Sequence, residues 1–147
     1  QNWPNIFQMI GTDKFIQEYS LVAKVAAASL MLLVIMLVLA QSREMSGEGI
    51  WYVGLVLSIL IPYVMPQMDE RAGLLSCVLY LLFAMKHPDL YYLAIIQVII
   101  TYISFSAYFR GESVIPLSAA ALAELFVLLL TILRADHVWQ AQKEEAR

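Results

Sequence analysis

A single glutamate, Glu124, interrupts an apolar stretch near the C-terminus, where residues 118–133 read SAAALAELFVLLLTIL. A carboxylate at the middle of a membrane-crossing helix costs at least ~2.5 kcal/mol, so it should face other helices, a partner or a water-filled cavity. One interpretation is a proton or cation site, and the other is a structural hydrogen bond to a neighbouring helix. Small residues favour the second, because Ala119 and Ala123 are spaced to let two helices approach closely.

Lys24 is the candidate charged partner for Glu124. It lies about one turn into the first apolar segment, where its stem can also extend to the lipid headgroups without any partner. In parallel helices the two residues would differ in depth by roughly 9 Å, at ~1.5 Å per residue, so a direct ion pair requires shifted segment boundaries. Ala23 and Ala27 give this segment a small face that could pack against the last segment.

A polar stripe is predicted on the segment at residues 90–109. Gln97, Thr101, Ser104 and Tyr108 follow one another at steps of four, three and four, which is helical spacing. The stripe is either the wall of a hydrated cavity or pocket, or a source of interhelical hydrogen bonds worth about 0.6 kcal/mol each. Tyr108 also suits a membrane interface, because it lies near the end of the segment.

Five apolar segments carry these residues, at positions 21–40, 50–65, 72–85, 90–109 and 114–133. Four are expected to cross the ~30 Å hydrocarbon core, and the last is expected to start after Ser113 with Pro116 in its first turn. The segment at 72–85 would reach only ~21 Å at ~1.5 Å per residue. The fold class is therefore all-α, a polytopic helical membrane protein with four or five transmembrane helices.

The two ends of the chain differ from this core. Residues 1–19 mix aromatic and polar side chains, with Trp3 and Phe7 at helical spacing, and predict an amphipathic segment in the membrane interface. Residues 20–134 form the predicted membrane domain, and residues 135–147 a polar helical tail. We expect a multi-pass protein with a cytosolic C-terminus, because Arg134, Lys143 and Arg147 lie close to the last segment.

Composition narrows the function classes. The chain has 147 residues, of which 61% are hydrophobic and 14% charged, and its net charge is −3 with no basic run, which argues against nucleic acid as a partner. Cys77 stands alone, and His87 and His137 share no ligand-like spacing, so we expect no disulfide, metal or cofactor. Known catalytic motifs are missing, which argues against an enzyme.

The leading hypothesis is a non-catalytic membrane subunit or accessory scaffold. It would contact the lipid bilayer and pack against other membrane subunits or a second copy of itself. One alternative is the transmembrane input module of a signalling receptor whose effector follows residue 147. Another is a small proton-coupled transporter or channel centred on Glu124.

Overall fold

The computed structural model of the chain describes residues 4, 6, 18–41, 47–65, 71–112 and 114–147, and all regular structure among them is helical. The α-helices are α3 (Ser20–Gln41), α4 (Gly47–Val64), α5 (Ala72–Lys86), α6 (Tyr91–Arg110) and α7 (Leu117–Glu145), and the short 3₁₀-helix η2 (Pro88–Leu90) leads into α6. The predicted interfacial segment, with Trp3 and Phe7, falls almost entirely outside the described residues and stays a prediction.

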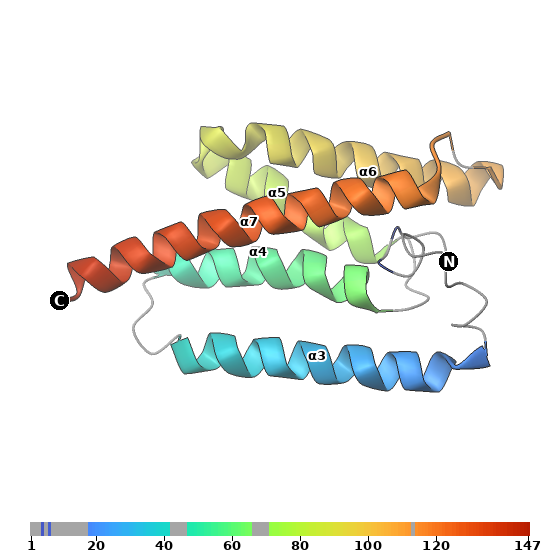
Figure 1. Ribbon diagram of the computed structural model, residues 1–147. Helices are drawn as coiled ribbons and strands as arrows, with labels where there is room; N and C mark the ends of the chain where they lie inside the picture. The colour runs from blue at the N-terminus through green and yellow to red at the C-terminus, as the bar shows by residue number, and fades with distance from the viewer. Residues whose placement is uncertain (1–3, 5, 7–17, 42–46, 66–70, 113) are drawn as a thin grey trace.

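Four of these helices form a closed ring around a shared core. Helix α4 packs against α5 and α7, and α6 packs against the same two helices. Helix α3 lies outside this ring and contacts α4 (Figure 1). This position differs from the expected packing of the first apolar segment against the last, because α4 occupies the place beside α7.

Two helix ends follow directly from local sequence. Helix α5 ends before His87, which is extended with φ −126° and ψ 92°, as expected for the residue before a proline such as Pro88. Helix α6 ends before Gly111, whose φ of 72° is left-handed and costs little only for glycine. The N–H of Gly111 donates to Ala107 O at 3.0 Å and satisfies one carbonyl at the helix end.

Helix α7 departs from its expected boundary at its start. It begins at Leu117, three residues later than expected, because Pro116 disfavours helical backbone at Ile115 and itself lies outside the helix with ψ 131°. The expected N-cap, Ser113, lies outside the described residues. At the other end α7 continues without a break to Glu145, so the apolar segment and the predicted helical tail form one helix.

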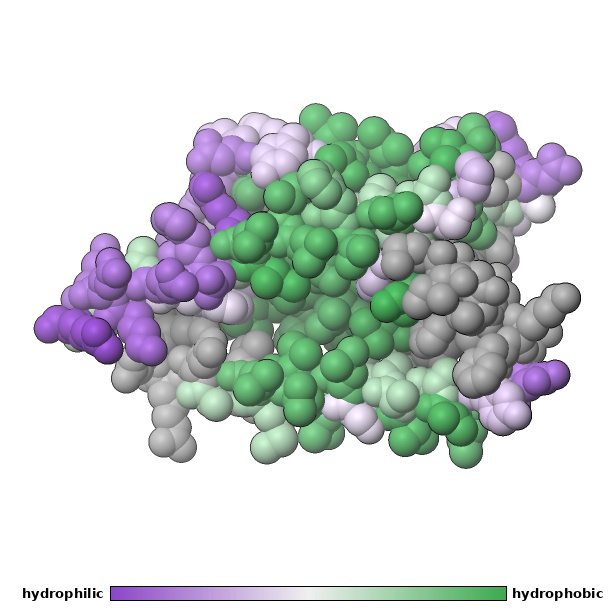
Figure 2. All heavy atoms as spheres, viewed as in Figure 1, coloured by the Kyte–Doolittle hydropathy of each residue, from purple (hydrophilic) through white to green (hydrophobic). Residues whose placement is uncertain are grey.

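Among the residues that the structure describes, three helices are long and apolar enough to cross a membrane by length and composition. They are α4, α6 together with η2, and α7, while shorter apolar stretches lie in α3 at Leu21–Leu37 and in α5 at Gly73–Lys86. Figure 2 shows hydrophobic side chains gathered across the middle of one face, with hydrophilic side chains at its two ends. All the helices run roughly along the same axis (Figure 1).

Candidate functional site

Polar side chains are buried inside the ring of helices. Within the described part of the chain, Gln97, Ser104 and Glu124 have no exposed surface, and Thr101 and Thr131 have almost none. Helix α7 buries a stripe with steps of three and four, and Glu124 lies in it between Ala121 and Val127. The stripe turns Glu124 inward because its apolar neighbours on the same face pack against α4 and α6.

Gln97 joins three helices through one nitrogen. Its Nε2 donates to Ser76 Oγ on α5 at 2.9 Å and to Glu124 Oε1 on α7 at 3.2 Å. Ser76 in turn donates its own hydroxyl to Gly73 O at 2.8 Å. Both amide hydrogens of Gln97 are therefore in use, and this side chain ties α5, α6 and α7 together at one level.

A second hydrogen bond joins α5 and α7. The hydroxyl groups of Tyr80 and Thr131 are in contact, and Thr131 also donates to Val127 O at 2.7 Å. A threonine hydroxyl has one hydrogen, so Tyr80 must be the donor to Thr131. We call Ser76, Tyr80, Gln97, Glu124 and Thr131 the polar cluster.

Oxygen atoms in this region lack hydrogen-bond partners. Glu124 Oε2, Gln97 Oε1 and Ser104 Oγ are all buried without one. Most buried polar atoms in proteins are paired, because an unpaired one costs about 1–3 kcal/mol. Glu124 and Gln97 are bonded to each other and still each keep one unpaired oxygen, which marks this pair as the chemically unusual point of the fold.

The structure separates the predicted polar stripe of α6 into two parts. Gln97, Thr101 and Ser104 are buried, and Thr101 donates to Gln97 O at 2.8 Å. Tyr108 is 56% exposed, because it lies in the last turn of α6. It packs edge to face on Phe109 and takes no part in the polar cluster.

Lys24 and Glu124 do not form an ion pair in the structure. Lys24 is exposed on α3, whereas Glu124 is enclosed by the ring. The hydrogen-bond partner of Glu124 is instead the uncharged amide of Gln97.

The small residues next to Glu124 are buried, but in a different register from the expected one. Ala119 is exposed and Ala123 only half-buried, whereas Ala120 and Ala121 are buried at 3% and 0% exposure. On α3, Ala27 is buried and Ala23 is half-buried. Spacing alone cannot choose between adjacent registers of a run of alanines.

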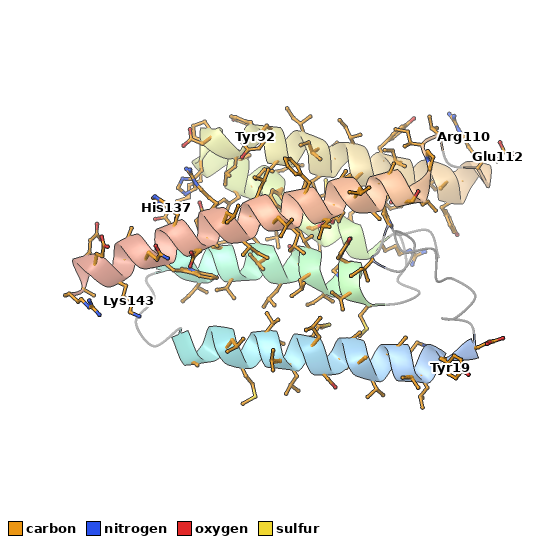
Figure 3. The ribbon with its side chains drawn as sticks, in the orientation of Figure 1. Tyr19, Tyr92, Arg110, Glu112, His137 and Lys143 are labelled. Atoms are coloured by element: carbon orange, nitrogen blue, oxygen red, sulfur yellow. The ribbon has the colours of Figure 1, made fainter. Side chains whose placement is uncertain are left out.

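Acidic side chains lie beside basic ones at one end of the molecule. His87 Nε2 lies 2.8 Å from Glu48 Oε1, and Arg134 lies 3.3 Å from Asp89. Figure 3 shows His137 and Lys143 toward this end, and Arg110, Glu112 and Tyr19 at the other end. Among the described residues, no three His, Cys, Asp or Glu side chains come together as a metal site would require.

Sequence reasoning missed three members of the polar cluster. Ser76 and Tyr80 are four residues apart and thus share a face of α5, and Thr131 lies seven residues after Glu124 on the same face of α7. Helical spacing from Glu124 was the available signal for Thr131. The two positions on α5 had no such signal, because only the fold brings α5 beside α7.

An apolar groove of about 280 Å³ lies on the outside of the ring, between α4 and α5. Its lining residues are Ile50, Trp51, Gly54, Leu55, Leu79 and Phe83. At Gly54, a Cβ atom would meet no other atom within 4 Å.

No protein-family model, no curated protein and no solved structure matches this chain.

Proposed function

We infer that the chain is a multi-pass membrane protein that acts as a non-catalytic subunit or scaffold, packing against partner helices in a larger membrane complex. Helices α3 to α7 would be its membrane-spanning elements. Two features support this proposal: the distribution of polar side chains, and the thin attachment of α3 to the other helices.

The positions of hydrophobic and polar side chains support insertion into a membrane. In the described part of the chain three helices have the length and composition of membrane spans, and hydrophobic side chains cover the middle of the face shown in Figure 2. Arg110 and Glu112 at one end, and His137 and Lys143 at the other, suit two aqueous sides (Figure 3). Water-soluble proteins expose few contiguous apolar patches of this extent.

The exposed surface of helix α3 supports the proposal that the chain binds a partner helix. Its large apolar side chains are mostly exposed, among them Leu30, Leu33 and Leu37, while Ala27 packs against the ring. Lipid tails are as apolar as leucine, so no hydrophobic force presses α3 onto α4 within a bilayer. A helix held by so narrow a contact has room for a second helix on its free side.

Small residues on α3 suit that free side. Ala26 and Ser29 are both exposed, and they share a face with Leu33. Ser29 donates to Val25 O at 2.8 Å, so its hydroxyl hydrogen is already in use within the helix. Small residues let helix backbones approach closely, which is how membrane helices gain their packing contacts.

Photo-crosslinking tests the partner surface directly. A photoreactive amino acid at Leu33 on α3 should capture another protein chain in native membranes. The same photoreactive amino acid in place of Ile95 on α6 is the matched control, since Ile95 is 58% exposed and Leu33 57%. Lipid adducts alone at both positions would contradict the proposal, and capture of a second copy would identify self-association.

Cysteine labelling tests the membrane topology. In a Cys77→Ala background, Lys86→Cys at the end of α5 and Glu112→Cys after α6 should react with impermeant reagents from opposite sides. Five crossings also require Gln67→Cys to react from the same side as Glu112→Cys. Labelling of Gln67→Cys and Lys86→Cys from one side would show that α5 does not cross.

A further inference from the structure

Glu124 and Gln97 are hydrogen-bonded to each other and each keep one unpaired oxygen. Gln97 Nε2 donates to Glu124 Oε1, while Glu124 Oε2 and Gln97 Oε1 have no partner. Both unpaired atoms accept hydrogen bonds, and an ionised carboxylate has no hydrogen to donate. What the pair lacks is one hydrogen.

We propose that Glu124 and Gln97 form a proton-binding site, in which Glu124 is a neutral acid and its Oε2–H donates to Gln97 Oε1. The acid and the amide then exchange two hydrogen bonds in a ring, with Gln97 Nε2–H donating to Glu124 Oε1. One bound proton thereby satisfies both unpaired oxygens at once. This inference is independent of whether α3 binds a partner.

The surroundings of Glu124 favour the neutral form. Helix α6 contributes the uncharged Gln97, α4 contributes Tyr63, and α5 contributes Tyr80 within electrostatic range of the carboxyl group. Among the described residues, no lysine, arginine or histidine forms an ion pair with Glu124. A buried carboxylate without a positive partner gives up its charge by binding a proton.

The bound proton links the packing of α6 and α7 to pH. When the proton leaves, Glu124 Oε2 and Gln97 Oε1 become two acceptors with no donor between them, next to an uncompensated negative charge. Either water enters or the helices separate at this level. The site is thus a place where proton release would loosen the ring.

Infrared spectroscopy of the full chain in lipid bilayers tests the proton itself. At neutral pH the wild type should show the C=O stretch of a protonated carboxyl group, shifted by ¹³C labelling of glutamate. Glu124→Gln should lose this band, and Glu112→Gln, which alters an exposed carboxyl group after α6, should keep it. Absence of the band in the wild type, or its survival in Glu124→Gln, would overturn the proposal.

Two further measurements distinguish a ring of two hydrogen bonds from a proton held elsewhere. Gln97→Leu should shift the band, because the acid C=O loses its Nε2–H donor; an unshifted band would contradict the pairing.

The folded wild type keeps a proton that an exposed glutamate releases above about pH 4.3, so its melting temperature should fall as pH rises. Glu124→Gln replaces the O–H donor by an N–H donor and should remove most of this pH dependence. A wild-type melting temperature that depends on Na⁺ concentration and not on pH would contradict the proposal and indicate that the site binds a metal ion.

Discussion

The polar groups inside the ring and those at its ends are held in opposite ways. Inside, Gln97 and Glu124 are fully buried and bonded through an uncharged amide. At one end, Arg134 and Asp89 form an ion pair whose side chains are 47% and 76% exposed. The comparison indicates that this fold uses charge where water can solvate it and neutral hydrogen bonds where water is excluded.

Buried hydrogen bonds and exposed ion pairs also differ in how much free energy is lost when they are removed. A buried hydrogen-bonded group costs about 1–3 kcal/mol when its partner is removed, because the remaining group stays unsatisfied. An exposed ion pair is worth about 0–1 kcal/mol, because water and salt screen both charges. Substitutions inside the ring should therefore have larger effects than charge removal at its end.

Gln97→Leu should have the largest effect. It removes the donor to both Ser76 and Glu124, and it should lower the free energy of unfolding by about 1–3 kcal/mol. Thermal unfolding of the purified chain in mild detergent would measure it. Val98→Leu, at the next position and 39% exposed, is the control and should change little. Equal melting temperatures for the two variants would contradict the claim that buried polar groups contribute more to stability than exposed positions do.

Glu124 is tested by a pair of substitutions. Glu124→Leu removes the hydrogen bond to Gln97 and should weaken the ring by about 1–2 kcal/mol. Glu124→Gln keeps the shape and the hydrogen-bonding capacity, so it should unfold close to the wild type. Loss of function in Glu124→Gln, with unchanged stability and unchanged partner recovery, would instead support the proton-coupled transporter.

Local sequence was enough to predict most of the helices, because turn residues and apolar runs act over short distances. The expected segment at 72–85 corresponds to α5 (Ala72–Lys86), and Pro88 ends that helix as its restriction on the preceding residue requires. Hydrophobicity fades after Leu133 while helix propensity continues, and α7 accordingly runs on to Glu145, into the helical tail predicted at residues 135–147.

The candidate site was predictable on α6 and α7 but not on α5. An isolated carboxylate among apolar residues identifies Glu124, and helical spacing identifies Gln97, Thr101 and Ser104. Which helices meet is a property of the whole ring, so Ser76 and Tyr80 could not be found from spacing within one segment. The same limit misplaced α3 beside α7 and chose Ala119 where Ala120 is buried.

Tyr80→Phe tests how much a single buried hydrogen bond contributes to stability. It removes the donor to Thr131 and leaves the ring packing unchanged, so it should cost about 0.6 kcal/mol, the average for polar contacts between membrane helices. Tyr92→Phe on the exposed surface of α6 is the matched control and should cost nothing measurable. A shift in Tyr92→Phe as large as that in Tyr80→Phe would show that burial is not the deciding factor.

Charge removal at the end of the molecule should have the smallest effect. Glu48→Gln removes the carboxylate that lies 2.8 Å from His87 Nε2 but keeps a polar side chain of the same size, so the loss should stay within about 0–1 kcal/mol. Asp89 lies 3.3 Å from Arg134, and Asp89→Asn should cost even less, because the Asp89 side chain is 76% exposed.

Both losses of stability should shrink in high salt, which screens exposed charges, whereas the effect of Gln97→Leu should persist. Unfolding measured at low and high ionic strength would thus separate the two kinds of polar contact, and a salt-insensitive loss of several kcal/mol in Glu48→Gln would show that this end of the ring is as dry as its middle.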